Sequence, residues 1–163
     1  MARKRKGNNK RLDMLKSTKI YALLFFAGAA IFIINTTIIS CIFTAYPWTV
    51  TAVMGKGSWW LTQTILIKII YVGLISPILE ELVFRRYIYG WFLKKDMSST
   101  GIVVSSALFS LYHILFGWGW MKAVIMFPIG IIFAIIYKKY RLKGAITAHL
   151  GNNISSVAMM ALL

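Results

Sequence analysis

Residues 65–93 read ILIKIIYVGLISPILEELVFRRYIYGWFL, an almost wholly apolar stretch that nevertheless contains Glu80, Glu81 and Arg85. An ionisable group at membrane depth costs at least ~2.5–3.5 kcal/mol on insertion scales, so such a group marks a functional site by default. If the stretch is helical, Glu81 and Arg85 are four residues apart and can form an ion pair. Glu80 then lies about 100° around the helix, free to face another group. A structural ion pair accounts for Glu81 and Arg85, but it leaves Glu80 unexplained.

The composition predicts a membrane protein. The chain has 163 residues, of which 59% are hydrophobic and 14% charged, and its mean hydropathy is +0.72. A soluble domain of this size is about a quarter charged. Several windows hold enough consecutive apolar residues to cross a bilayer as helices. We therefore expect an all-α, polytopic transmembrane helix bundle, in which the single cysteine, Cys41, can form no intrachain disulfide.

The formal charge of +15 raises the question of a nucleic-acid partner. The basic residues, however, lie at the ends of apolar segments rather than on one soluble face. That distribution is typical of topology determinants and of contacts with anionic lipids. We expect an anionic bilayer, and no nucleic acid, as the partner of these charges.

The apolar stretches predict about five spans. Residues 1–19 carry eight basic residues against Asp13 and predict a cytosolic tail. A first transmembrane helix is expected at 20–44, because this run is too long for the apolar core of a signal peptide. A loop with interfacial aromatic residues follows at 45–60. The later spans are expected at 61–93, 101–116, 123–137 and 144–163, and the alternation of basic loops places the N-terminus in the cytosol.

Counting residues from the predicted turns gives an expected depth for the polar groups. Glu80 and His113 each lie ~20 Å along a helix from the turn between the second and third spans, so they should face each other near mid-bilayer. His149 lies only ~9 Å beyond Lys143. Two alternatives follow: the last helix begins deeper, or the site lies nearer the cytosolic surface.

The polar residues within the spans predict one common site. They include both histidines of the chain, His113 and His149, together with Glu80 and Asn153. A buried glutamate can take a proton from water, a histidine can position that water, and an asparagine amide can donate to a developing oxyanion. This set suits hydrolysis of an amide bond by activated water.

A zinc site is the alternative for the same residues. His113, His149 and one glutamate, for which Glu80 is the candidate, would leave an open position on the metal. The compact His-Glu-x-x-His pattern is absent from the sequence, so we favour a site with no metal and no other cofactor.

Three motifs carry a family resemblance. Pro77–Arg85 resembles a motif E-E-x-x-x-R, Phe109–His113 resembles F-x-x-x-H, and His149–Asn153 resembles H-x-x-x-N. In this order, each on its own predicted helix, they resemble the CAAX protease and bacteriocin-processing family of intramembrane proteases, also called Abi. The resemblance covers residues 61–163 and leaves the tail (1–19) and the first helix (20–44) outside.

The resemblance implies an endopeptidase that cleaves peptides or membrane proteins at the membrane. Glu80 would be the general base, with Glu81 and Arg85 supporting it. His113 would contact the water, and His149 with Asn153 would form the oxyanion site. The family has been described both as metalloproteases and as metal-free glutamate proteases.

Bacterial members of this family include bacteriocin immunity proteins, so the expected location is a bacterial cell membrane. The chain has fewer spans than the eukaryotic enzymes, which leaves open that an oligomer completes the substrate cavity. The alternative functions are a non-enzymatic immunity or peptide-binding protein on the same scaffold, and a small proton- or cation-coupled carrier that uses Glu80 as its relay.

Overall fold

The computed structural model describes residues 2–55 and 62–162, with side chains from Lys16 onward. No strand occurs in these residues, so the predicted all-α architecture is confirmed. The elements in chain order are α1 (Ala2–Ala45), α2 (Thr49–Met54), α3 (Ile65–Ile67), η2 (Lys68–Ile75), α4 (Ser76–Glu80), η3 (Glu81–Tyr89), α5 (Gly90–Leu93), α6 (Ser98–Leu115) and α7 (Trp120–Leu162).

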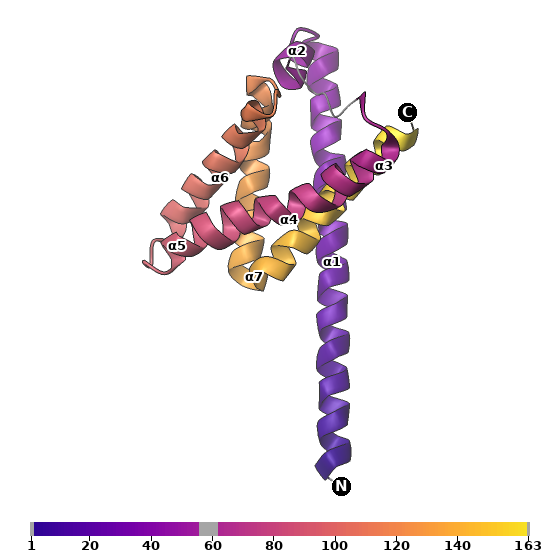
Figure 1. Ribbon diagram of the computed structural model, residues 1–163, viewed down its shortest axis with the longest axis vertical. Coiled ribbons are helices and arrows are strands. Elements are labelled where there is room, and N and C mark those ends of the chain that lie inside the picture. Colours follow the sequence, from indigo (N-terminus) through magenta and orange to yellow (C-terminus); the bar gives the residue numbers. More distant parts are fainter. Residues whose placement is uncertain (1, 56–61, 163) are drawn as a thin grey trace.

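The stretch that decides the fold forms one continuous helical rod from α3 to α5 (Figure 1). Two of its segments, η2 and η3, have the wider π-helical hydrogen bonding, and they flank α4. Pro77 stands near the start of α4 and has no N–H, so the normal helical bond to the carbonyl of Gly73 cannot form. The helix therefore changes its winding just before the acidic pair. Such π segments are frequent at functional sites.

Three of the described helices are long and apolar enough to cross a membrane: residues Lys16–Ala45, Ser98–Leu115 and Trp120–Leu162. The last of these, α7, contains the predicted span 123–137 and the described part, up to Leu162, of the predicted span 144–163. The basic loop expected between those spans is not an extended loop. The chain stays helical there except at Arg141, whose φ of 59° reverses its direction within one residue. The helical rod of 65–93 is divided by its π segments and is not one of the three.

The N-terminal region also differs from the sequence expectation. The basic residues 2–19 continue the first transmembrane helix as part of α1 rather than forming a separate tail. The loop expected at 45–60 contains the short helix α2, and of its aromatic residues Trp59 and Trp60 lie outside the described residues.

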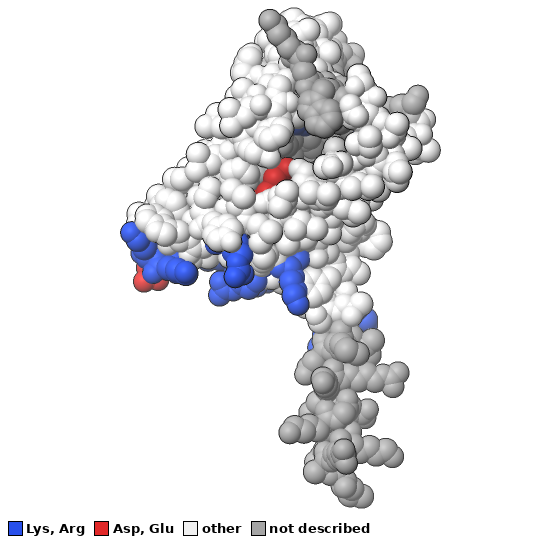
Figure 2. All heavy atoms as spheres, viewed as in Figure 1, with Lys and Arg blue, Asp and Glu red and all other residues white. Residues whose placement is uncertain are grey.

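Lysine and arginine side chains gather along one edge of the molecule (Figure 2). This edge is formed by the turn between α5 and α6 and by the kink in α7, whose basic residues belong to two different predicted loops. One membrane face is thus basic, as the alternation along the sequence requires. That this face is cytosolic stays a prediction.

The first helix packs closely against the second half of α7. A Cβ built on Gly28 would lie 1.8 Å from the carbonyl oxygen of Ala148, and one built on Gly151 would lie 2.0 Å from that of Phe25. Only glycine permits this approach, which is the way small residues bring membrane helices together. The contact lies beside His149, so α1 fixes the position of that part of α7.

Candidate active site

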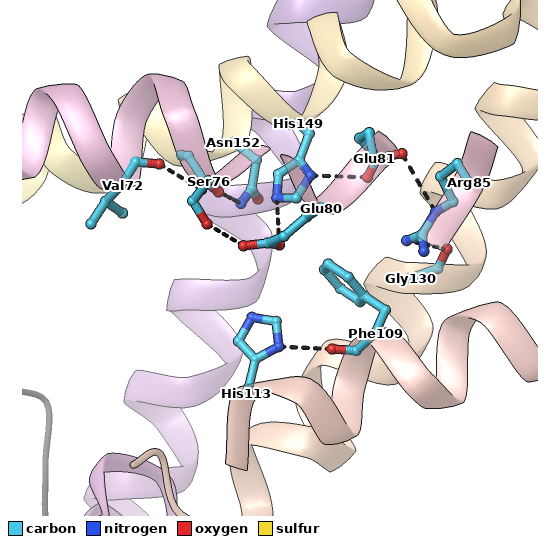
Figure 3. A network of polar contacts seen from close by, with 11 residues as sticks. Val72, Ser76, Glu80, Glu81, Arg85, Phe109, His113, Gly130, His149 and Asn152 are labelled. Atoms are coloured by element: carbon cyan, nitrogen blue, oxygen red, sulfur yellow. Dashed lines mark hydrogen bonds and ion pairs between the residues drawn. The ribbon is translucent and has the colours of Figure 1, made fainter. Parts of the chain in front are cut away.

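Four helical segments bring the predicted polar residues together (Figure 3). Glu80 ends α4 and Glu81 begins η3, while His113 comes from α6 and His149 from α7. Glu81 is fully buried and Glu80 exposes 6% of its surface. The sequence expected Glu80 and Glu81 to face different groups, and both in fact reach the same histidine ring.

His149 bridges the two glutamates. Its Nδ1 lies 3.0 Å from Oε1 of Glu81, and its Nε2 lies 3.7 Å from Oε2 of Glu80. The other carboxylate oxygen of Glu80 accepts a hydrogen bond from the hydroxyl of Ser76. The ring of His149 also stacks on Phe133, with the ring centroids 4.5 Å apart and an interplanar angle of 26°. The imidazole is thus held on its edge by carboxylates and on its face by an aromatic ring.

Arg85 forms a buried ion pair with Glu81. Its Nε lies 3.5 Å from Oε2 of Glu81, so the ion pair expected from the i, i+4 spacing is present. Its Nη2 donates to the carbonyl oxygen of Gly130 at 3.2 Å, and its guanidinium carbon lies 4.7 Å from the centre of the Phe109 ring. Arg85 and Glu81 are both fully buried. Glu81 therefore joins the arginine to His149.

His113 stands apart from this network, on the other side of the cavity. Its Nδ1 lies 2.9 Å from the carbonyl oxygen of Phe109, one turn earlier in α6. Because a carbonyl only accepts, Nδ1 carries the proton, and the lone pair is left on Nε2. The ring of Phe109, whose position the second motif marks, lies between the two histidines, 5.1 Å from His113 and 5.8 Å from His149.

Asn153 connects the site to the backbone of the glutamate-bearing rod. Its Nδ2 donates to the carbonyl oxygen of Val72 at 2.9 Å, and its Oδ1 accepts from Nδ2 of Asn152 at 3.0 Å. Val72 lies in the π-helical segment η2. One amide hydrogen of Asn153 is committed to the fold, and these contacts leave the second one unused.

These residues open onto a cavity of about 590 Å³. Glu80, His113, His149 and Asn153 are part of its wall, which is otherwise mostly apolar. Figure 2 shows acidic atoms at the bottom of a hollow near the middle of one face. The first helix, which the resemblance left outside the core, also lines this cavity. Glu81 and Arg85 do not line it and lie behind Glu80 and His149.

Sequence reasoning missed several residues of the site. Ser76 was not among the predicted residues, although its position four residues before Glu80 signals a shared face. Asn152 precedes a motif residue and gave no separate signal, and Phe133 looks like any packing residue in an apolar span. Lys122 also lines the cavity, with its Nζ 4.5 Å from the centre of the Trp118 ring.

The zinc alternative fits this arrangement poorly. Among the described residues, no three side chains of His, Cys, Asp or Glu are grouped so that they could hold a metal ion. Both nitrogens of His149 face carboxylates, and Nδ1 of His113 faces a carbonyl. The described residues at this site therefore do not fit a catalytic zinc ion.

Comparison with known proteins agrees with the motifs. Residues 62–155 match the family model described as Type II CAAX prenyl endopeptidase Rce1-like. The chain is also similar to the UPF0177 protein YxdF of Lactococcus lactis subsp. lactis (strain IL1403), with 28% identity over 113 residues. This region is 69% of the present chain and 60% of YxdF, so the chain spans about 60% of the length of that relative. No solved structure matches.

The family match contains all seven residues that the motifs marked: Glu80, Glu81, Arg85, Phe109, His113, His149 and Asn153. The helices that carry them converge on one cavity. The chain belongs to the Rce1-like family of type II CAAX prenyl endopeptidases.

Proposed function

We propose that this protein is an intramembrane endopeptidase in which Glu80 activates the water that hydrolyses a peptide bond. The observation that carries the proposal is the contact between Glu80 and His149 on the wall of a cavity, with His113 across from them. A membrane endopeptidase family supplies the reaction class. The residue roles are those that the family resemblance implies, and the contacts of Glu80, His113 and His149 support them.

The first step is the attack of water on the peptide carbonyl. The free lone pair on Nε2 of His113 accepts one hydrogen of the water and orients it. Glu80 takes the other proton as the water oxygen bonds to the carbonyl carbon. The electron pair of the C=O bond moves onto the oxygen, so that a tetrahedral oxyanion forms.

The oxyanion is stabilised by donors that are already in place. Protonated His149, held by Glu81, donates from Nε2, and Asn153 donates its second amide hydrogen. Donors fixed in advance at the position of developing charge are typically the largest single contribution to such catalysis. In the second step the C–N bond breaks, Glu80 gives its proton to the leaving amine, and a carboxyl product remains.

The expected substrate is a peptide or a membrane protein with an apolar segment, because the cavity wall is mostly apolar. We place the protein in a bacterial cell membrane, with its basic edge against anionic lipid and with no nucleic-acid partner. Cleavage by cross-linked samples tests whether one copy or an oligomer forms the active unit.

The test is peptide cleavage by the purified full chain in liposomes that contain anionic lipid. Wild type, Glu80→Gln and His149→Ala are compared on a peptide library and on host membrane proteins, with mass spectrometry as the readout. Glu80→Gln keeps the shape and the hydrogen bond to Ser76 but cannot accept a proton. We expect it to lower kcat by about 10²–10⁴-fold. Arg86→Gln is the matched control, because Arg86 is exposed on the same rod.

Two further measurements complete the experiment: cleavage in the presence of a metal chelator, and cleavage by cross-linked samples of known oligomeric state. Cleavage that persists in chelator supports the glutamate mechanism. If chelator abolishes cleavage and added zinc restores it, Glu80, His113 and His149 are zinc ligands instead. Activity proportional to the monomer fraction after cross-linking would favour a complete monomeric site. If folded wild type cleaves nothing, and Glu80→Gln still protects cells from a bacteriocin, the non-enzymatic immunity function replaces the protease.

A further inference from the structure

The first helix forms one wall of the active-site cavity, although it lies outside the residues 62–155 that match the family. The α1 residues on that wall recur at helical spacing, so they make one face of the helix. They are Phe32, Asn35, Thr36, Ile39 and Phe43. Two polar residues thus stand in the middle of an otherwise apolar wall.

Asn35 is a polar residue of this wall that pairs with no other described residue. Within the part of the chain that the structure describes, its side-chain amide makes no hydrogen bond, although the residue is half-buried. Thr37, by contrast, is exposed on another side of α1 and donates to the carbonyl oxygen of Ile33 at 2.9 Å. An asparagine in a membrane span is normally satisfied by a neighbouring helix. Because Asn35 lines a cavity instead, its donor and acceptor remain available to a ligand.

The position of Asn35 relative to the catalytic groups is fixed. The close contacts of Gly28 with Ala148 and of Gly151 with Phe25 lock α1 against α7 beside His149. Asn35 lies seven residues beyond Gly28, which is ~10 Å along the helix axis. An extended peptide covers this distance in about three residues. A peptide that runs along α1 from the contact beside His149 therefore reaches Asn35 within about three residues.

We propose that Asn35 binds the backbone of the peptide substrate, acting as a substrate-positioning residue supplied by α1. This inference rests on the proposed endopeptidase function. The asparagine amide can donate to one peptide carbonyl and accept from one peptide N–H. A peptide that enters an apolar cavity loses these bonds to water, and nothing in lipid replaces them. Asn35 would replace these hydrogen bonds to the peptide backbone without contacting the substrate's side chains.

The test combines a variant with a modified substrate. Asn35→Leu has nearly the same size but no polar atoms, and Thr37→Val is the matched control on the lipid side of α1. For a peptide cleaved by wild type, we expect Asn35→Leu to lower kcat/KM by about tenfold to a hundredfold, chiefly through KM, and Thr37→Val to leave it unchanged. Asn35→Gln should recover part of the loss.

A scan of backbone N-methylation along the peptide identifies the bond itself. Methylation at one position of the peptide should cost wild type about as much as the Asn35→Leu substitution, and should cost Asn35→Leu almost nothing further. Such non-additivity is not expected from a merely structural role. Thermal unfolding in detergent monitors folding, and Asn35→Ala replaces Asn35→Leu in the same scan if the latter melts early.

Three results would overturn the inference. In the first, Asn35→Leu cleaves as well as wild type. In the second, every methylated peptide shows the same fold decrease in kcat/KM with wild type and with Asn35→Leu. In the third, Asn35→Leu abolishes a cross-linked dimer together with activity, which would make Asn35 a contact between copies. If Glu80→Gln also cleaves normally, it is the proposed function that fails, so the two failures are distinguishable.

Discussion

The buried pair of Arg85 and Glu81 provides the sharpest test of the site's architecture. Both side chains are fully buried, yet their ion pair is long, at 3.5 Å, and Arg85 makes one hydrogen bond, to Gly130. In the described chain, Nε and Nη1 of Arg85 and Oε2 of Glu81 have no hydrogen-bond partner. Such a pair barely repays its desolvation, but removing one partner leaves an uncompensated buried charge.

We therefore predict that Arg85→Met and Glu81→Gln each lower the free energy of unfolding by about 3–5 kcal/mol. That is about 10²–10³-fold or more in the unfolding equilibrium, because each ~1.4 kcal/mol is tenfold. The double variant Glu81→Gln with Arg85→Met should recover most of the loss, since no unpaired charge remains. The measurement is unfolding in mixed micelles of increasing dodecyl sulfate, followed by circular dichroism.

Activity separates the two roles of Glu81. Because Glu81 also holds Nδ1 of His149, the double variant should be stable but still cleave peptides at least about tenfold more slowly than wild type. Arg86→Met, on the exposed side of the rod, should stay within about 0.5 kcal/mol of wild type. The reasoning is refuted if the two single losses simply add in the double variant, or if the double variant regains full activity.

Two further predictions concern packing around the histidine. Gly151→Val should separate α1 from α7 and lower both the melting temperature and the rate of cleavage, because its Cβ would lie 2.0 Å from the carbonyl oxygen of Phe25. Gly73→Ala is the control, because the atom nearest to its new Cβ, in the side chain of Ile154, would be 3.8 Å away. Phe133→Leu should remove the ring stacked on His149 and lower kcat by about tenfold, while thermal unfolding shows only the about 1–3 kcal/mol cost of a smaller core side chain. Unchanged kcat in Phe133→Leu would mean that the carboxylates alone hold the imidazole.

Local patterns in the sequence predicted much of the site. The spacing of Glu81 and Arg85 predicted their ion pair, and the convergence of Glu80 with His149 followed from the cost of isolated polar groups in a membrane. The depth estimate was less useful, because it treated each helix as perpendicular to the bilayer. The rod of α3 to α5 and the second half of α7 both run obliquely to α1 (Figure 1), so residue counts along them are not depths. The two helices therefore meet although their counts differ.

The role of the first helix could not be predicted in the same way. Gly28 and Asn35 are single residues of their type in a long apolar run, so their spacing forms no periodic pattern that would predict a contact. The three family motifs lie in other helices. Their meaning depends on which face of α1 meets α7, and that is a property of the packing. The stacking of Phe133 on His149 is hidden for the same reason, because a phenylalanine in a span is compatible with any packed position.

The charges of the buried cluster explain why a second glutamate accompanies the proposed base. Glu80, Glu81, Arg85 and His149 are joined by contacts, and two carboxylates against one guanidinium leave room for one more proton if the cluster is to be neutral. The proposed mechanism places that proton on His149, so that Glu80 is the ionised group that accepts a proton from water. When it does so, the negative charge moves to the oxyanion beside the imidazolium, so no net charge is created in a medium where net charge is expensive. Without Glu81 the same imidazolium, together with Glu80 and Arg85, would give the cluster a net positive charge in that medium. In the proposed mechanism Glu81 thus takes part without lining the cavity, because its negative charge balances the imidazolium of His149 while Glu80 is the base.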